Sequence, residues 1–222
     1  MLNMVEFMRD VHQNARAHGW WDKPRGMRSV RALIVSEWSE ALEEDRSGRP
    51  MLWHRCADAG NQAGTIVMCE TAANCPCKVD AMPESCAVYC EKPEGVAVEL
   101  MDGCIRILDW LGFEKFDEDM MPGTMEGACL RGRSLIERAM IAAMDGNGNA
   151  LHDADDLPLD MLVDLLTEYT MKTSGGYGQF ALIQALCIAC AWVQAHGVDP
   201  EKLIMLKHEF NKGRPYKHGK KY

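Results

Sequence analysis

Two stretches of sequence decide the fold: LIVSEWSEALEE at residues 33–44 and VELMDGCIRILD at residues 98–109. In each stretch apolar residues recur at spacings of three and four, which is the period of an amphipathic helix. Each stretch also carries two acids three positions apart, Glu37 with Glu40 and Glu99 with Asp102. Side chains three positions apart leave the same side of a helix. The sequence therefore predicts two helices that each present a pair of carboxylates on one face.

The rest of the chain has the same helical period almost throughout. Its 222 residues are enough for one well-buried domain. Short breaks rich in glycine and proline separate the periodic segments. We therefore expect an all-α helical bundle that forms a single domain over residues 1–222. The predicted helices cover about 5–17, 28–47, 95–111, 128–144, 158–172, 178–196 and 199–211.

One segment, about 51–93, breaks the helical pattern and lies between the two carboxylate helices. It is rich in Cys, Ala, Gly, Asn and Pro, so we interpret it as a Cys-containing insertion. Its cysteines either hold a structural Zn²⁺ or are reduced thiols, because Cys-x-Cys and Cys-x₃-Cys spacings occur without a Cys-x₂-Cys pair. The cysteines of the insertion are Cys56, Cys69, Cys75, Cys77, Cys86 and Cys90, whereas Cys104, Cys129, Cys187 and Cys190 lie in apolar helical patterns and are expected in the core.

The acid pairs could be solvated helix faces, since the same spacing occurs elsewhere in the chain. The two pairs singled out above lie in strongly apolar surroundings, however. Charges embedded in an apolar helix need partners. Oxygen ligands of this kind suit hard divalent cations. We expect Glu37, Glu40, Glu99 and Asp102 to bind Mg²⁺ or Mn²⁺.

The two stretches together resemble the E-x-x-E…E-x-x-D signature of the MazG-like all-α NTP pyrophosphatases. Two further segments are similar to phage-type members of that family: HGWWDKP at 18–24 and NKGRPYKHGKKY at 211–222. The resemblance covers about 1–50, 94–112 and 199–222. It does not extend to the insertion or to the helices between 112 and 199.

The resemblance implies a metal-dependent hydrolase that splits a nucleoside triphosphate between its α and β phosphates. The products would be a nucleoside monophosphate and pyrophosphate. Glu37, Glu40 or Glu43 would accept the proton of the attacking water, and the sequence leaves the choice open. Phage relatives that favour guanine nucleotides make dGTP or GTP the first substrates to try.

Cationic side chains gather at the end of the chain. Residues 207–222 carry six Lys or Arg and one Glu, a net charge of +5, whereas the whole chain carries −9. A basic tail on an acidic body suits a compact anion such as a triphosphate, although a solvated terminus has the same composition. The candidate phosphate ligands are Lys207, Asn211, Arg214 and Lys217, followed by His218 and Lys220. Arg106, four residues after Asp102, is expected to pair with Asp102 or, alternatively, to contact phosphate.

Two aromatic residues, Trp20 and Trp21, precede the first carboxylate helix. They either stack on the nucleobase or close the end of the bundle as buried aromatics. The sequence alone leaves both interpretations open.

Composition argues against several other classes of protein. The acidic net charge disfavours nucleic-acid binding, and the apolar run Phe180–Val193 is too short for a membrane span. Ten cysteines without a secretory signal indicate the cytoplasm, which would be the host cytoplasm for a phage protein. So much apolar helix predicts a homodimer or homotetramer. The alternatives are a non-catalytic helical interaction protein and a di-iron carboxylate bundle, although the latter needs Glu-x-x-His pairs that the chain lacks.

Overall fold

The computed structural model describes residues 1–55, 68–69, 92–114, 118–142, 154–172 and 178–216. This part of the chain contains seven α-helices, three short strands and one 3-10 turn at Glu118–Met120. The helices are α1 (Met4–Ala17), α2 (Met27–Arg46), α4 (Val96–Phe113), α5 (Met125–Ala142), α6 (Leu159–Met171), α7 (Gly178–Ala195) and α8 (Pro200–Lys212). The strands are β1 (Trp53–Arg55), β2 (Met68–Cys69) and β3 (Lys92–Glu94).

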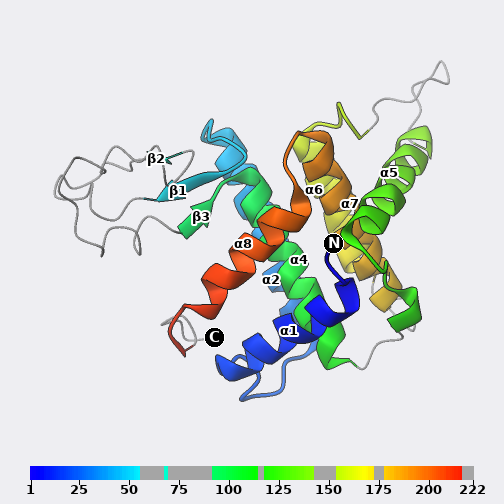
Figure 1. The fold of residues 1–222 in the computed structure, drawn as a ribbon. Coiled ribbons are helices and arrows are strands. Elements are labelled where there is room, and N and C mark those ends of the chain that lie inside the picture. Colours follow the sequence, from blue (N-terminus) through cyan, green and yellow to red (C-terminus); the bar gives the residue numbers. More distant parts are fainter. Residues whose placement is uncertain (56–67, 70–91, 115–117, 143–153, 173–177, 217–222) are drawn as a thin grey trace, which may run out of the picture.

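Two buried helices, α4 and α7, form the centre of the molecule and pack against each other (Figure 1). Helices α1, α2 and α8 contact α4, and helices α5 and α6 contact α7. Helix α6 also packs on α2, which joins the two groups. One continuous apolar core runs through all of them. The prediction of an all-α fold is confirmed.

Helix α4 is buried nearly all round, and its few charges lie on one face. Those charges are Glu99, Asp102, Arg106 and Asp109, at successive spacings of three, four and three. This spacing places them in one row along the helix. The other sides of α4 are apolar and contact α1, α2, α7 and α8. The sequence of α4 thus leaves a single polar face in the interior.

Two glycines permit the closest helix contacts. A Cβ atom on Gly103 of α4 would lie 2.2 Å from the ring of Trp38 on α2, which is fully buried. A Cβ atom on Gly132 of α5 would lie 1.9 Å from the carbonyl oxygen of Cys187 on α7. Neither contact tolerates a side chain, so these positions determine how closely the helices approach.

Helices α1 and α8 begin at side-chain caps, Asn3 and Asp199. The Asp199 carboxylate accepts hydrogen bonds from the backbone N–H groups of Glu201 and Lys202, and Pro200 occupies the first turn. Helix α5 begins at Met125, three residues before the expected start, because the hydroxyl of Thr124 accepts a hydrogen bond from the backbone of Gly127.

Both ends of the insertion and a short segment within it form a small antiparallel sheet in the order β2-β1-β3, which the sequence did not predict. Trp53 of β1 is fully buried and donates its indole N–H to Glu44 at 2.7 Å. Gly95 connects β3 to α4 with φ of 115°, and its Cβ position lies 2.6 Å from the carbonyl oxygen of Pro50. The cysteine side chains considered for zinc lie outside the described residues, so that site stays a prediction.

Helix α7 is long and apolar enough to cross a membrane by length and composition alone. Most of it is buried inside the protein, where it packs on α5 and α6. The four cysteines expected in the core are free and buried there. Burial raises the pKa of Cys129 to about 12, so this thiol stays protonated.

Candidate active site

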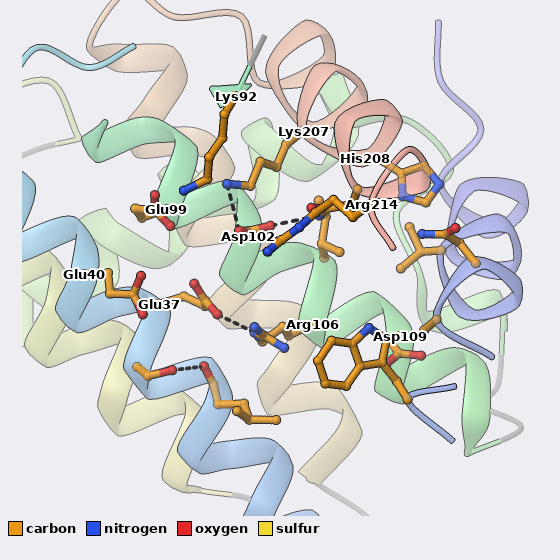
Figure 2. Close-up of a pocket in the computed structure, with 18 of the residues that line it drawn as sticks. Glu37, Glu40, Lys92, Glu99, Asp102, Arg106, Asp109, Lys207, His208 and Arg214 are labelled. Atoms are coloured by element: carbon orange, nitrogen blue, oxygen red, sulfur yellow. Dashed lines mark hydrogen bonds and ion pairs between the residues drawn. The ribbon is translucent and has the colours of Figure 1, made fainter. Parts of the chain in front are cut away.

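A cavity of about 220 Å³ collects the polar faces of α2, α4 and α8 (Figure 2). Helix α1, the loop that follows it and strand β3 complete its lining. Figure 2 shows Lys92 and Lys207 reaching in from one side and Glu37 and Glu40 from the other. The structure therefore brings together two acid pairs that are about 60 residues apart in the sequence. Helical spacing predicts that the two members of each pair share a face.

Three carboxylates meet in this cavity. Glu37, Glu40 and Glu99 each place an oxygen within 4.8 Å of the other two. Glu37 and Glu99 are buried, with residue exposures of 4% and 5%, whereas Glu40 is exposed. Like charges at this separation repel one another unless a proton or a cation lies among them.

The protonation of the two buried acids reflects this crowding. Burial raises the pKa of Glu99 to about 8, and the nearby charges of Asp102 and Glu37 add to the rise, although Lys207 opposes it. Burial also raises the pKa of Glu37, with Arg106 opposing the shift. Both carboxyl groups are therefore poor at holding a negative charge until a cation joins them.

Asp102, the fourth expected ligand, lies beside these three acids but has other partners. Its carboxylate is 2.9 Å from the Lys207 ammonium and accepts a hydrogen bond from Asn211 at 3.3 Å. Burial alone would raise its pKa, but Lys207 and Arg106 hold that pKa below the ordinary value. Asp102 is thus an ionised carboxylate whose charge a lysine already neutralises.

The expectation that Arg106 pairs with Asp102 is wrong. Arg106 donates from Nε to Glu37 at 2.5 Å, across the interface between α4 and α2. The spacing of four residues would have permitted a pair with Asp102, but Lys207 and Asn211 approach that carboxylate from α8. Contacts between helices therefore decide the pairing rather than contacts within one helix.

Some of the residues predicted to bind phosphate line the cavity, together with basic residues that were not predicted. Lys207, Asn211 and Arg214 line it, one turn apart on α8 and just beyond. Lys92 of β3 and Arg25 of the loop after α1 also line it, and the sequence did not single them out. Neither residue lies in a helical pattern, so no period could have indicated its direction. The predicted residues Lys217, His218 and Lys220 lie outside the described residues.

The two adjacent tryptophans differ in their surroundings. Trp20 lines the cavity and has the guanidinium of Arg25 over its ring, 5.0 Å from the centroid. Trp21 stacks on Phe113 with ring centroids 4.2 Å apart and donates its indole N–H to Asp109 at 2.8 Å. Each of the two interpretations of the sequence therefore fits one tryptophan: Trp20 faces the cavity and Trp21 packs against the end of α4.

Glu43 does not belong to this site. It is absent from the cavity lining, its side chain is 71% exposed, and its nearest cation is Arg46 at 3.8 Å. The helix period explains this position, because six residues rotate by about 600° and leave Glu43 about 120° around α2 from Glu37. Its expected role as a catalytic base does not fit the structure.

A histidine that the sequence did not single out lines the same cavity. His208 is 1% exposed, and its Nε2 lies 2.9 Å from the Asp10 carboxylate. Burial lowers its pKa, with Asp10 opposing the shift. Its Nδ1 has no hydrogen-bond partner among the described residues. His208 is thus a buried neutral imidazole at the cavity, with one of its two nitrogens unpaired among the described residues.

The donor set fits a hard divalent cation. All three convergent side chains are carboxylates, which suit Mg²⁺ or Mn²⁺ rather than a softer metal. The buried members have raised pKa values that a bound cation would reverse. Basic side chains line the same cavity beside these acids, as Figure 2 shows for Lys92, Arg106 and Lys207, and would bind an anion next to such a cation.

Comparison with known proteins gives no relative on which to base an identity. No family model, no curated protein and no solved structure matches this chain significantly.

Proposed function

We propose that this protein is a metal-dependent nucleoside triphosphate pyrophosphohydrolase. The observation that carries the proposal is the cavity itself, in which three carboxylates lie within 4.8 Å of one another and basic side chains line the same space. A cluster of this kind suits divalent cations, and the basic side chains suit phosphates. A complex of a divalent cation with a triphosphate supplies both a cation for the carboxylates and phosphates for the basic side chains.

Glu37, Glu40 and Glu99 would hold Mg²⁺ or Mn²⁺, with Asp102 next to them. The bound ions would neutralise the phosphates and lower the pKa of a coordinated water. Lys92, Arg106, Lys207 and Arg214 would bind the phosphate oxygens and stabilise the charge that gathers on them in the transition state. Trp20 would stack on the base.

Glu40 is the best-placed proton acceptor among the candidate residues. It lies in the cavity and is exposed, whereas Glu37 is held by Arg106. It would take one proton from the attacking water, whose oxygen bonds to phosphorus as the α–β bridging bond breaks. The products are a nucleoside monophosphate and pyrophosphate. Base preference depends on contacts beyond Trp20, and dGTP and GTP are the first substrates to test.

A nucleotide panel tests this function directly. Each common dNTP and NTP is incubated with Mg²⁺, with Mn²⁺ or with EDTA, and pyrophosphate and monophosphate are both measured. We expect equal amounts of the two products, released only with a metal. Glu99→Gln should lose this activity, and Glu168→Gln, an exposed acid on α6, should retain it. Failure of every nucleotide to release pyrophosphate would remove the proposal.

A further inference from the structure

Two ion pairs in the cavity each join an acidic side chain to a basic one. Arg106 lies 2.5 Å from Glu37, and Lys207 lies 2.9 Å from Asp102. In each pair the acid is a candidate for a metal and the base is a candidate for a phosphate. Without ligands, the two groups therefore neutralise each other.

The charge of the cavity lining is nearly balanced. Six carboxylates and five basic side chains line it, a formal net charge of −1 with every group ionised and histidine neutral. A triphosphate alone or a pair of divalent cations alone would leave a large uncompensated charge in a partly buried site, which is costly. When a triphosphate and two divalent cations bind together, their charges nearly cancel. The lining acids are Glu37, Glu40, Glu94, Glu99, Asp102 and Asp109, and the lining bases are Arg25, Lys92, Arg106, Lys207 and Arg214.

The two bases differ in their freedom to leave their partners. The side chain of Arg106 is 33% exposed, whereas that of its partner Glu37 is 5% exposed, so the guanidinium has more room to move than the carboxylate has. The side chain of Lys207 is 3% exposed, and its ammonium also donates to the carbonyl oxygen of Pro93 at 3.4 Å. Arg106 is therefore the base that can exchange partners with little rearrangement.

We propose that Arg106 is an exchangeable counter-ion. A divalent cation takes the place of Arg106 at Glu37, and the released guanidinium then binds phosphate oxygens, while Lys207 keeps its partners Asp102 and Pro93. Metal and triphosphate consequently bind with positive coupling, and each strengthens the binding of the other. This inference rests on the proposed function for the identity of the anion, but the exchange itself requires no turnover.

Titration of Mn²⁺ without any nucleotide tests the exchange. Arg106→Met removes the competing base and should bind Mn²⁺ about tenfold more tightly than the unchanged protein. Arg106→Lys keeps the charge and should bind Mn²⁺ with nearly the original affinity. Arg25→Met is the matched control, because Arg25 lines the same cavity without an ion pair to Glu37. Its change in affinity should be clearly smaller. Equal or weaker Mn²⁺ binding by Arg106→Met would overturn the inference.

A second measurement on the unchanged protein covers the case in which Arg106→Met does not fold. The Nε–H signal of Arg106 is followed by NMR during titration with diamagnetic Mg²⁺. We expect the signal to move away from its position in the hydrogen bond to Glu37. A signal that stays in place while Mg²⁺ binds would contradict the exchange.

The coupling is measured with inorganic tripolyphosphate as the anion. Mn²⁺ and tripolyphosphate together should raise the melting temperature by more than the sum of their separate effects, and Arg106→Met should reduce this excess. An excess that Arg106→Met leaves unchanged would count against the exchange. Because no bond is cleaved, this result is independent of hydrolysis. Coupling without pyrophosphate release from any nucleotide would remove the proposed function alone, and hydrolysis without coupling would remove this inference alone.

Discussion

At the scale of single residues, the adjacent tryptophans predict opposite phenotypes. Trp20→Ala should weaken nucleotide binding about tenfold and leave stability nearly unchanged, because a base that stacks on Trp20 loses its platform. Trp21→Ala should lower the free energy of unfolding by about 2 kcal/mol, because it removes the stack on Phe113 and the hydrogen bond to Asp109. Nucleotide titration and denaturant unfolding of both variants measure the two effects. The reverse pattern would show that Trp21, not Trp20, meets the base.

Lys92 offers a second prediction at this scale, because it extends from the end of the insertion into the cavity. Its ammonium pairs with Glu94, yet the side chain remains 38% exposed, so a phosphate can reach it. We expect Lys92→Met to raise the KM for the nucleotide several-fold with a smaller effect on kcat. Lys172→Met, at an exposed lysine just after α6, is the control and should leave both constants unchanged. An unaltered KM in Lys92→Met would show that the insertion supplies no substrate contact.

At the scale of helices, the glycine contacts separate stability from site geometry. Gly103→Ala would place a methyl group in the ring of Trp38, forcing α2 away from α4. Because Glu37 lies on α2 and Glu99 on α4, we expect lower stability, by about 1–3 kcal/mol, together with weaker Mn²⁺ binding. Unfolding curves and Mn²⁺ titration of the folded protein measure the two effects.

Gly132→Ala provides the matched control for that prediction. It creates a similar clash between α5 and α7, two helices that contribute no residue to the cavity lining. Stability should fall by a comparable amount while the Mn²⁺ affinity of the folded protein is retained. Equal loss of Mn²⁺ affinity in both variants would mean that the metal site responds to the whole bundle rather than to the α2–α4 contact.

Helices were the part of this structure that sequence could predict. Apolar residues at spacings of three and four predicted all seven helices of the described residues. Their ends are displaced by a few residues, as for α5, which begins just after Thr124. It also indicated which carboxylates share a face. Partner choice was not predictable, because Arg106 has Asp102 within its own helix and Glu37 only across an interface. Lys92 and Arg25 were missed since strand ends and loops have no period. The expected dimer or tetramer and the cytoplasmic location stay predictions.

For the whole molecule, the buried acids predict an unusual dependence of stability on pH. The pKa of Glu99 is raised from 4.5 to about 8, so the folded state holds a proton that the unfolded state releases. Stability should therefore fall as pH rises through this window. The lowered pKa of Asp102 changes the stability only below about pH 4, and the lowered pKa of His208 changes it only below pH 6.5. Burial raises the pKa of Glu37 as well, so the decline in melting temperature in EDTA between pH 6.5 and 8 contains both acids, and a Gln variant separates them.

A divalent cation should reverse this trend, because it binds the ionised carboxylates. The rise in melting temperature on adding Mg²⁺ is expected to be larger at pH 8 than at pH 6.5. Glu99→Gln should flatten the pH dependence in EDTA, because the amide does not titrate. A decline in EDTA that persists unchanged in Glu99→Gln would assign it to other groups.

The contact between Pro50 and Gly95 has a consequence for how this protein can be altered. The chain leaves the bundle after α2 and returns to it at α4 with those two backbones touching, and Ala97 donates to the carbonyl oxygen of Met51 at 3.0 Å. The two ends of the intervening segment are thus already closed, so its length costs the bundle little entropy. This junction is therefore a suitable insertion site: a fluorescent reporter inserted between β1 and β3 would lie next to the cavity, because Lys92 and Glu94 of β3 line it.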